Sequence, residues 1–237
     1  NIYYREAGTG TPFIIIPGWT AASEHFLKQI AYFSDRYRVI SYDPRSQGDS
    51  SKTWENNNYT QHGKDLKAFM DALELKDVIL MGHSAGCADA YAYFRAYGTD
   101  NVKAFICIDS NFKAVSETEG EWGDPFTYEG TKGFFNILIY NRKEWIRPFI
   151  ESMLVNPVAE EVTWFYEQLI KTPDPVALLL MADVMMIDYT EEAKMIAEKI
   201  PVLNVVAESP GWSDEAEAWF KANAPKTQVV IMPGVKH

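Results

Sequence analysis

Short apolar segments alternate with helical patterns along most of the chain. Several of these segments show almost no polar alternation, as is typical of parallel strands covered on both faces. The strands that this pattern predicts are residues 13–17, 38–42, 78–82, 104–109, 202–207 and 228–232, with a further strand at 2–6. Apolar positions spaced by three and four predict helices at residues 59–73, 85–97 and 214–222. We therefore expect an α/β fold, with a mostly parallel central sheet and helices on both faces.

The alternation stops between residues 115 and 190. This segment contains helical patterns rich in aromatic residues and methionine, without a convincing strand. We expect it to form a helical lid inserted into the sheet domain, which then comprises residues 1–114 and 191–237. Most aromatic side chains of the lid are expected to hold its helices together, but as a set they imply an apolar pocket. The candidate pocket residues of the lid are Phe134, Phe135, Trp145, Phe149 and Trp164.

Composition narrows the class of ligand. The chain has 237 residues, a length that suits one domain with a sizeable core. Its formal net charge is −11. Such a charge argues against a nucleic acid or an anionic membrane as partner, because both would be repelled across most of the surface. A small, neutral or weakly charged molecule is the expected ligand. The oligomeric state is left open.

The two cysteines bear on the compartment. Cys87 and Cys107 each lie inside an apolar segment, so a disulfide framework or a cysteine metal site is not expected. Thiols in the cytoplasm are the simplest interpretation. No segment has the apolar length of a membrane span, and no basic-then-apolar leader opens the chain. The chain is expected to be cytoplasmic, or to have lost a leader, and its abrupt ends suggest further residues beyond both.

A serine lies at the sharpest predicted turn of the chain. The sequence Gly82-His83-Ser84-Ala85-Gly86 connects the strand at 78–82 to the helical pattern that follows. Holding a serine at such a turn requires strained backbone, and glycines two positions away avoid collisions with the neighbouring strand and helix. The Ser84 hydroxyl would then be exposed above the sheet, with the Ala85 amide directed at a developing oxyanion. Helix capping by Ser84 is the structural alternative, and His83 is interpreted as structural or pocket-lining.

A serine nucleophile needs a base, and histidine is the usual one. The chain offers four histidines. His25 and His62 lie in or beside predicted covering helices, and His83 adjoins the serine. His237 follows the last predicted strand through a Pro-Gly turn, which brings it to the same carboxyl edge of the sheet as Ser84. We therefore assign His237 as the base; a disordered terminal histidine is the alternative.

These features together resemble the α/β-hydrolase superfamily, in its branch of serine esterases and cofactor-free haloperoxidases. The resemblance covers the turn at 82–86, the Ile-Pro-Gly-Trp segment at 16–19, the segment Tyr-Asp-Pro-Arg-Ser-Gln-Gly-Asp-Ser at 42–50 and the final Gly-Val-Lys-His at 234–237. It implies that the amide of Trp19 is the second oxyanion donor, alongside Ala85. Members often carry histidine where this chain has Pro17, which changes only the support of that amide.

Two parts of the sequence could supply the carboxylate of the triad. The resemblance implies an acid a few residues after the strand at 202–207, but Pro210 stands where aspartate is expected. A minority of the family takes the acid from the end of the strand after the nucleophile strand, here Asp109. Because adjacent parallel strands end on the same edge, Asp109 would lie near Ser84. Asp109 is preferred, with Glu208 and Asp214 as alternatives.

The expected chemistry is acyl transfer through Ser84 on a small, largely apolar ester or lactone. No metal-ligand cluster, phosphate-binding glycine loop or dinucleotide fingerprint is found, so no metal and no cofactor are expected. Asp43 and Arg45 are interpreted as a structural pair that steadies a loop. The resemblance leaves three alternatives open: a cofactor-free dioxygenase of N-heteroaromatic substrates, a cofactor-free haloperoxidase or perhydrolase, and a ligand sensor that turns over slowly.

Overall fold

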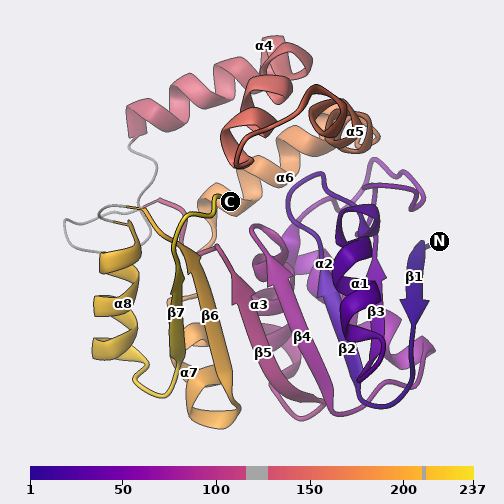
Figure 1. Ribbon diagram of the computed structural model, residues 1–237, viewed down its shortest axis with the longest axis vertical. Coiled ribbons are helices and arrows are strands. Elements are labelled where there is room, and N and C mark those ends of the chain that lie inside the picture. The colour runs from indigo at the N-terminus through magenta and orange to yellow at the C-terminus, as the bar shows by residue number, and fades with distance from the viewer. Residues whose placement is uncertain (116–127, 210–211) are drawn as a thin grey trace.

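A seven-stranded sheet forms the centre of the molecule. The computed structural model describes residues 1–115, 128–209 and 212–237. The strands are β1 (Tyr4–Ala7), β2 (Pro12–Ile16), β3 (Arg38–Tyr42), β4 (Val78–His83), β5 (Val102–Ile108), β6 (Val202–Ala207) and β7 (Gln228–Met232). They lie in the order β1-β3-β2-β4-β5-β6-β7, and only β1 runs antiparallel to its neighbour (Figure 1). The predicted mostly parallel sheet is confirmed.

Helices cover the two faces of the sheet unequally. The core helices are the 3₁₀ helix η1 (Ser23–Phe26), α1 (Leu27–Phe33), α2 (Tyr59–Ala72), α3 (Gly86–Tyr97), α7 (Thr190–Lys199) and α8 (Trp212–Asn223). Phe26 and Ile30 from η1 and α1 pack on one face, against Phe13, Ile15 and Met81. The other four helices pack on the opposite face, which presents side chains such as Ile14, Leu80 and Phe105. Neighbouring strand residues thus alternate between two apolar layers.

Local sequence explains where the central helices begin and how closely they pack. Asn58 precedes α2 in extended conformation, and its side chain accepts a 2.8 Å hydrogen bond from the Gln61 amide, as an N-cap residue does. Gly63 lies where α2 crosses α3, and a Cβ there would stand 2.6 Å from the backbone nitrogen of Tyr93. The sequence therefore lets α2 pack directly on the backbone of α3, the helix that follows the serine turn.

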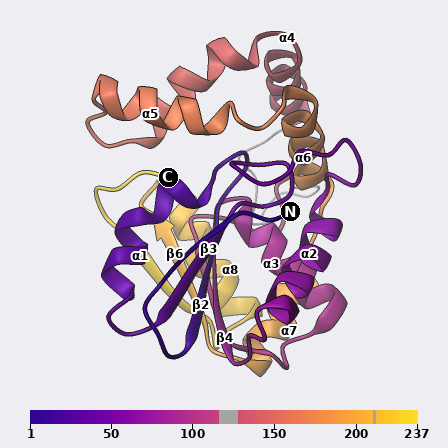
Figure 2. The ribbon, with the colours of Figure 1, turned by 90° about the vertical axis from the view of Figure 1, so that its right-hand side faces the viewer.

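Three helices lie above the carboxyl ends of the strands, where a lid was expected, and we refer to them as the lid. They are α4 (Tyr128–Met153), α5 (Ala159–Leu169) and α6 (Asp174–Met186), and Figures 1 and 2 show them together at one end of the molecule. Helix α4 bends at Asn141, whose φ of −140° is not helical. Residues 116–127 of the predicted lid lie outside the described residues. The last predicted lid residue, Thr190, begins α7 of the sheet domain.

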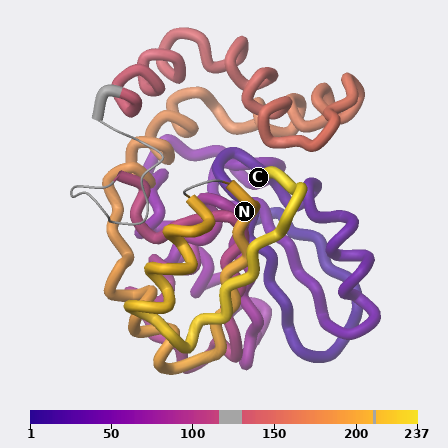
Figure 3. Tube along the Cα trace, turned by 60° about the vertical axis from the view of Figure 1, so that its left-hand side comes forward, coloured from indigo at the N-terminus to yellow at the C-terminus, as the bar shows by residue number. Residues whose placement is uncertain are grey.

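The chain ends beneath this lid. After β7, the last residues continue from the carboxyl edge of the sheet toward the lid, as the yellow end of the tube in Figure 3 shows. The turn uses Gly234, which has a φ of +68° in the left-handed region that favours glycine. Helices α1 and α7, of seven and ten residues, were not predicted from the sequence because each is short.

Candidate active site

Ser84 lies on a strained turn between β4 and α3. Its φ of 53° is unusual for a residue with a side chain. A Cβ at Gly82 would lie 2.7 Å from Cys87 Cα, and one at Gly86 would lie 2.4 Å from the carbonyl oxygen of Ile16. The collisions expected from the sequence are therefore confirmed, with the neighbouring helix at one glycine and the neighbouring strand at the other. Only glycine at both positions lets the turn keep Ser84 at its apex.

Asp109 comes directly after β5, on the strand next to that of the nucleophile. Its Oδ2 accepts a 2.5 Å hydrogen bond from Nδ1–H of His237. Its Oδ1 accepts a 2.8 Å bond from the amide of Ala207, and its own amide donates to Val205 over 2.7 Å. The carboxylate is thus anchored to the end of β6 on one side and to the final residue on the other.

Opposing effects act on the pKa of Asp109. Burial is the largest and raises it, because a buried carboxylate loses hydration. The hydrogen bonds from His237 and the Ala207 amide lower it and together prevail, so the pKa lies below its ordinary value. Asp109 therefore remains ionised and can hold the His237 ring with Nε2 free to accept a proton.

Ser84, Asp109 and His237 all line one cavity of about 1410 Å³ between the sheet domain and the lid. The alternative acid Glu208 also lines this cavity, whereas Asp214 does not. Among the described residues, Asp109 is the carboxylate that bonds to His237. Pro210, which stands at the usual acid position, lies outside the described residues.

The two residues whose amides were predicted as oxyanion donors, Trp19 and Ala85, lie in the same region. Ala85 is the N-cap of α3, and Trp19 follows the carboxyl end of β2; both residues line the cavity. A Cβ at Gly18 would lie 3.0 Å from Ser84 Cβ, so the segment that carries Trp19 packs directly on the serine turn. Within the described part of the chain, neither the Trp19 nor the Ala85 amide donates a hydrogen bond. Both are available to an oxyanion.

The lid and the sheet domain both supply apolar lining residues. Of the predicted pocket residues, the structure brings His83, Phe134, Trp145 and Phe149 to the cavity. Phe135 and Trp164 do not line it. Phe135 packs against the apolar core that contains Leu80 and Phe105, and Trp164 packs edge-on against His25. Successive residues of a helix point about 100° apart. The residues next to Phe135 and Trp164, which are Phe134 and Phe165, line the cavity instead.

Other lining residues were not found from the sequence. Met181, Val184 and Met185 of α6 belong to this group. Helix α6 is apolar on nearly all sides because it lies between the sheet domain and the other lid helices, so periodicity could not indicate its inward face. Its richness in methionine was the available signal. His25 was also missed as a lining residue, because it comes from a helix remote in sequence from the turn.

His83 lies beside the catalytic histidine candidate. The two imidazole rings have centroids 4.9 Å apart, and Phe26 packs edge-on against His83 at 6.0 Å. Burial, followed by the charge of His237, lowers the pKa of His83 to about 3. His83 is therefore neutral at ordinary pH. It contributes a wall of the cavity and does not compete with His237 for the serine proton.

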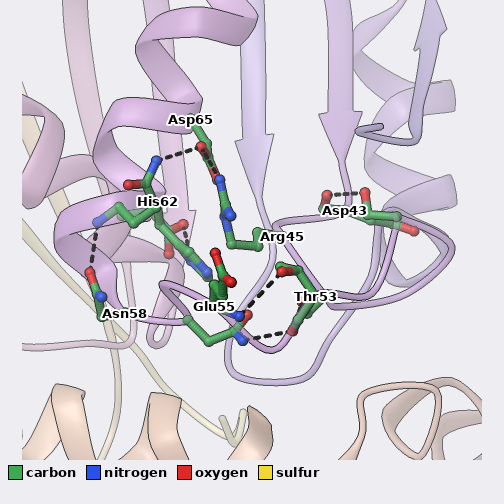
Figure 4. A network of polar contacts seen from close by, with 12 residues as sticks. Asp43, Arg45, Thr53, Glu55, Asn58, His62 and Asp65 are labelled. Carbon is green, nitrogen blue, oxygen red and sulfur yellow. Dashed lines mark hydrogen bonds and ion pairs between the residues drawn. The ribbon is translucent and has the colours of Figure 1, made fainter.

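The polar segment after β3 has a structural role, but its pairing differs from the prediction. Asp43 and Arg45 do not pair with each other: the Arg45 guanidinium binds both carboxylate oxygens of Asp65 on α2, over 2.7 and 2.8 Å (Figure 4). Asp43 accepts 2.6 Å hydrogen bonds from the amides of Ser23 and Asp49. Arg45 thus ties the segment to α2, and Asp43 ties it to the start of η1.

Comparison with known proteins agrees with this architecture. Residues 11–142 match the family model of the alpha/beta hydrolase fold, which is more than half of the chain. This chain belongs to the α/β-hydrolase fold family. Among solved structures, this α/β hydrolase resembles a bromoperoxidase from Bacillus anthracis with a TM-score of 0.90 at 22% identity, covering 99% of this chain and 87% of that one. At that identity the likeness concerns the fold.

Curated relatives of this α/β hydrolase match a smaller share of the chain than that structure does. A non-heme haloperoxidase of Rhodococcus erythropolis is 27% identical over 146 residues, which are 61% of this chain and 53% of that protein. A bifunctional esterase/perhydrolase of Acinetobacter calcoaceticus is 24% identical over 148 residues, with the same two shares of 61% and 53%. This hydrolase thus matches about half the length of these relatives. No helix among its described residues combines the length and apolarity needed to cross a bilayer.

Proposed function

We propose that this α/β hydrolase cleaves a small, largely apolar carboxylic ester or lactone through an acyl-enzyme on Ser84. The observation that carries the proposal is the 2.5 Å hydrogen bond between His237 and Asp109, at a cavity that Ser84 also lines. A serine on a strained turn and an oriented imidazole are the components that acyl transfer requires. The two unlinked thiols suit a reducing compartment, and we propose the cytoplasm.

In the proposed mechanism, Nε2 of His237 removes the hydroxyl proton of Ser84 as the serine oxygen attacks the substrate carbonyl. The amides of Trp19 and Ala85 hold the negative oxygen of the tetrahedral intermediate. His237 then gives the proton to the departing alcohol, leaving the acyl group on Ser84. Water, deprotonated by His237, attacks the acyl-enzyme in turn, which releases the acid and restores the serine. Asp109 holds the imidazole in the tautomer that both halves of the reaction need.

The lining of the cavity supports an apolar, uncharged substrate. Rings of Phe134, Trp145 and Phe149 and several methionine side chains form the lid side. The ionisable lining residues include Glu208 and Glu215 as well as Lys113 and Lys236, so neither sign of charge prevails, which suits an uncharged substrate. The volume of about 1410 Å³ exceeds the usual 300–1,000 Å³ of a ligand site, so substrates larger than an acetyl ester fit.

Perhydrolysis is the second candidate, and the names of the two curated relatives favour it. The same acyl-enzyme could be attacked by hydrogen peroxide instead of water. His237 would take a peroxide proton, the acyl–serine bond would break, and a peroxyacid would leave as the Ser84 hydroxyl is restored. Formation of peroxyacetic acid from acetate and hydrogen peroxide, with loss in Ser84→Ala, would support this activity.

Hydrolysis of p-nitrophenyl acetate and butyrate tests the main proposal. Ser84→Ala should lose at least about 10³-fold in kcat/KM, because the nucleophile is removed. Ser51→Ala, which changes an exposed serine that does not line the cavity, is the control and should match the wild type. Labelling by a serine-reactive phosphonate should place one adduct on Ser84. Equal, slow hydrolysis by wild type and Ser84→Ala would contradict acyl transfer at this serine.

A further inference from the structure

Trp19 connects the proposed oxyanion hole to the lid. We propose that its side chain is a positioning residue, which makes the oxyanion donor of the Trp19 backbone depend on the docked lid. This inference rests on the proposed function, because it assigns a role to Trp19 within that chemistry. It concerns the indole, whereas the proposed mechanism uses only the amide of the same residue.

The indole of Trp19 is held by helix α6. Its Nε1–H donates a 2.8 Å hydrogen bond to the carbonyl oxygen of Ala177, in the first half of that helix. The side chain is 7% exposed, so this bond is shielded from water and cannot readily be replaced by solvent. The residue whose main chain lies beside the serine turn is therefore anchored through its side chain to the lid.

Helix α4 holds the same ring from another direction. The Trp145 and Phe149 rings each meet the Trp19 ring edge-on, with centroids 6.5 Å away. The guanidinium of Arg142 lies 5.6 Å from the Trp19 ring centroid, within cation–π range. Trp19 is thus enclosed by two lid helices that are separate in sequence.

Arg142 is the residue that keeps these lid helices together. It is 4% exposed and donates to the carbonyls of Leu169 and Thr172 over 3.0 and 3.1 Å, at the end of α5 and in the connection to α6. It also pairs with Asp174, the first residue of α6, over 2.5 Å. Because one buried cation binds three points of the lid, α4 and α6 are expected to move as one unit against Trp19.

The backbone around Trp19 makes few other hydrogen bonds among the described residues. The next residue, Thr20, has a φ of 58°, and its side-chain hydroxyl is buried without a partner in the described structure. The turn is closed by one bond, from the Ala21 amide to the Gly18 carbonyl. The Trp19 amide itself donates no hydrogen bond to the described residues. The packing of Gly18 on the serine turn restrains this segment from one side, and the indole contacts with the lid restrain it from the other.

A small misorientation of an oxyanion donor is costly. Removing one donor lowers kcat by about 10²–10³-fold, and catalytic groups must be held within about 0.5 Å of their productive positions. Loss of the indole hydrogen bond should leave the donor present but poorly aligned. A fall in kcat of about 10-fold, without a matching change in KM, is the expected signature.

Trp19→Phe tests the proposal, since it keeps an aromatic ring and removes the N–H donor. We expect kcat to fall by about 10-fold for p-nitrophenyl acetate, butyrate and hexanoate alike, with KM within about twofold of the wild type. Affinity for an alkyl boronic acid, whose adduct with Ser84 mimics the tetrahedral intermediate, should weaken by the same factor. Trp54→Phe, at a tryptophan that is 71% exposed, is the control and should change neither quantity.

Two results would overturn the proposal. One is an unchanged kcat in Trp19→Phe; the other is a loss that grows with acyl length, which would make Trp19 a substrate contact only. If Trp19→Phe does not fold, Asp174→Asn replaces it, because Asp174 is half-exposed and its ion pair holds Arg142. This variant should lower kcat uniformly by about twofold or more. Wild type without any ester hydrolysis would contradict the proposed function instead, which separates the two failures.

Discussion

His237 donates a hydrogen bond from Nδ1 to Oδ2 of Asp109 over 2.5 Å, although the two residues are 128 positions apart in sequence. The other oxygen of Asp109 is bound by the Ala207 amide at the end of β6. One carboxylate therefore joins the ends of β5, β6 and the final segment after β7. This arrangement fixes the ring tautomer of His237. The candidate triad can form because these parallel strands end at the same edge of the sheet.

Asp109→Asn should inactivate the enzyme without unfolding it. The amide retains the shape of the side chain but supports the wrong imidazole tautomer, so we expect kcat to fall by about 10³–10⁴-fold. Steady-state hydrolysis of p-nitrophenyl butyrate, together with circular dichroism, measures both effects. Glu208→Gln is the matched variant, because Glu208 lines the same cavity and does not bond to His237. The opposite ranking would make Glu208 the triad acid.

Gly86→Ala should be one of the most damaging small substitutions in the chain. The added Cβ would lie 2.4 and 2.5 Å from the backbone carbonyl oxygens of Ile16 and Pro17, which no rotamer change can relieve. We expect a loss of about 3 kcal/mol in the free energy of unfolding, or failure to fold. The measurement is urea unfolding followed by circular dichroism.

Gly133→Ala provides the contrast for that substitution. Gly133 lies within α4, and no atom of the described chain comes within 4 Å of a Cβ placed there. Alanine should therefore stabilise the protein by about 0.5–1 kcal/mol through helix propensity. If both substitutions changed stability equally, the steric account of the serine turn would be wrong.

The parts of the site that sequence could predict are those encoded by local geometry. Glycines at 82 and 86 are required by the turn itself, and residues after parallel strands share one edge, so Ser84, Asp109 and His237 could be grouped. Arg45 could not be matched with Asp65 in this way. That pair depends on how the segment after β3 meets α2, which is a matter of tertiary packing.

The inward faces of the lid helices were beyond sequence reasoning for a related reason. Phe134 and Phe135 are adjacent and chemically identical, yet only Phe134 lines the cavity. The rotation of the part of α4 before Asn141 decides between them, and that rotation depends on tertiary packing such as the edge-on contact of Phe134 with Trp145. Both faces of such a helix are apolar, so the pattern identifies a lid without orienting it.

Trp145→Ala should weaken binding of longer esters more than binding of acetate. The Trp145 ring stacks on Phe149 with centroids 4.4 Å apart and lines the cavity, so its loss removes apolar contact with the acyl chain. We expect KM for p-nitrophenyl hexanoate to rise about 10-fold, and KM for the acetate to rise less than twofold. Phe135→Ala, at a lid ring outside the cavity, should leave that ratio unchanged; an equal effect of both would contradict the assigned lining.

The low pKa of His83 predicts how stability depends on pH. The folded value is about 3, below the ordinary 6.5, because burial and the neighbouring His237 disfavour the charged ring. Between these values the unfolded chain binds a proton that the native state does not, so native stability falls as pH decreases through this window. From pH 7.5 to pH 5 the contribution of His83 is about 2 kcal/mol.

His83→Gln should remove that contribution. Urea unfolding at pH 7.5 and pH 5 gives two free energies for each protein, and the decrease should be about 2 kcal/mol smaller in the variant than in the wild type. Any pH-independent effect of the substitution cancels, because each protein is compared with itself. His25, whose pKa burial also lowers, contributes to both decreases alike. Equal decreases in the two proteins would mean that His83 can be protonated in the folded state, and that it is not held neutral beside His237.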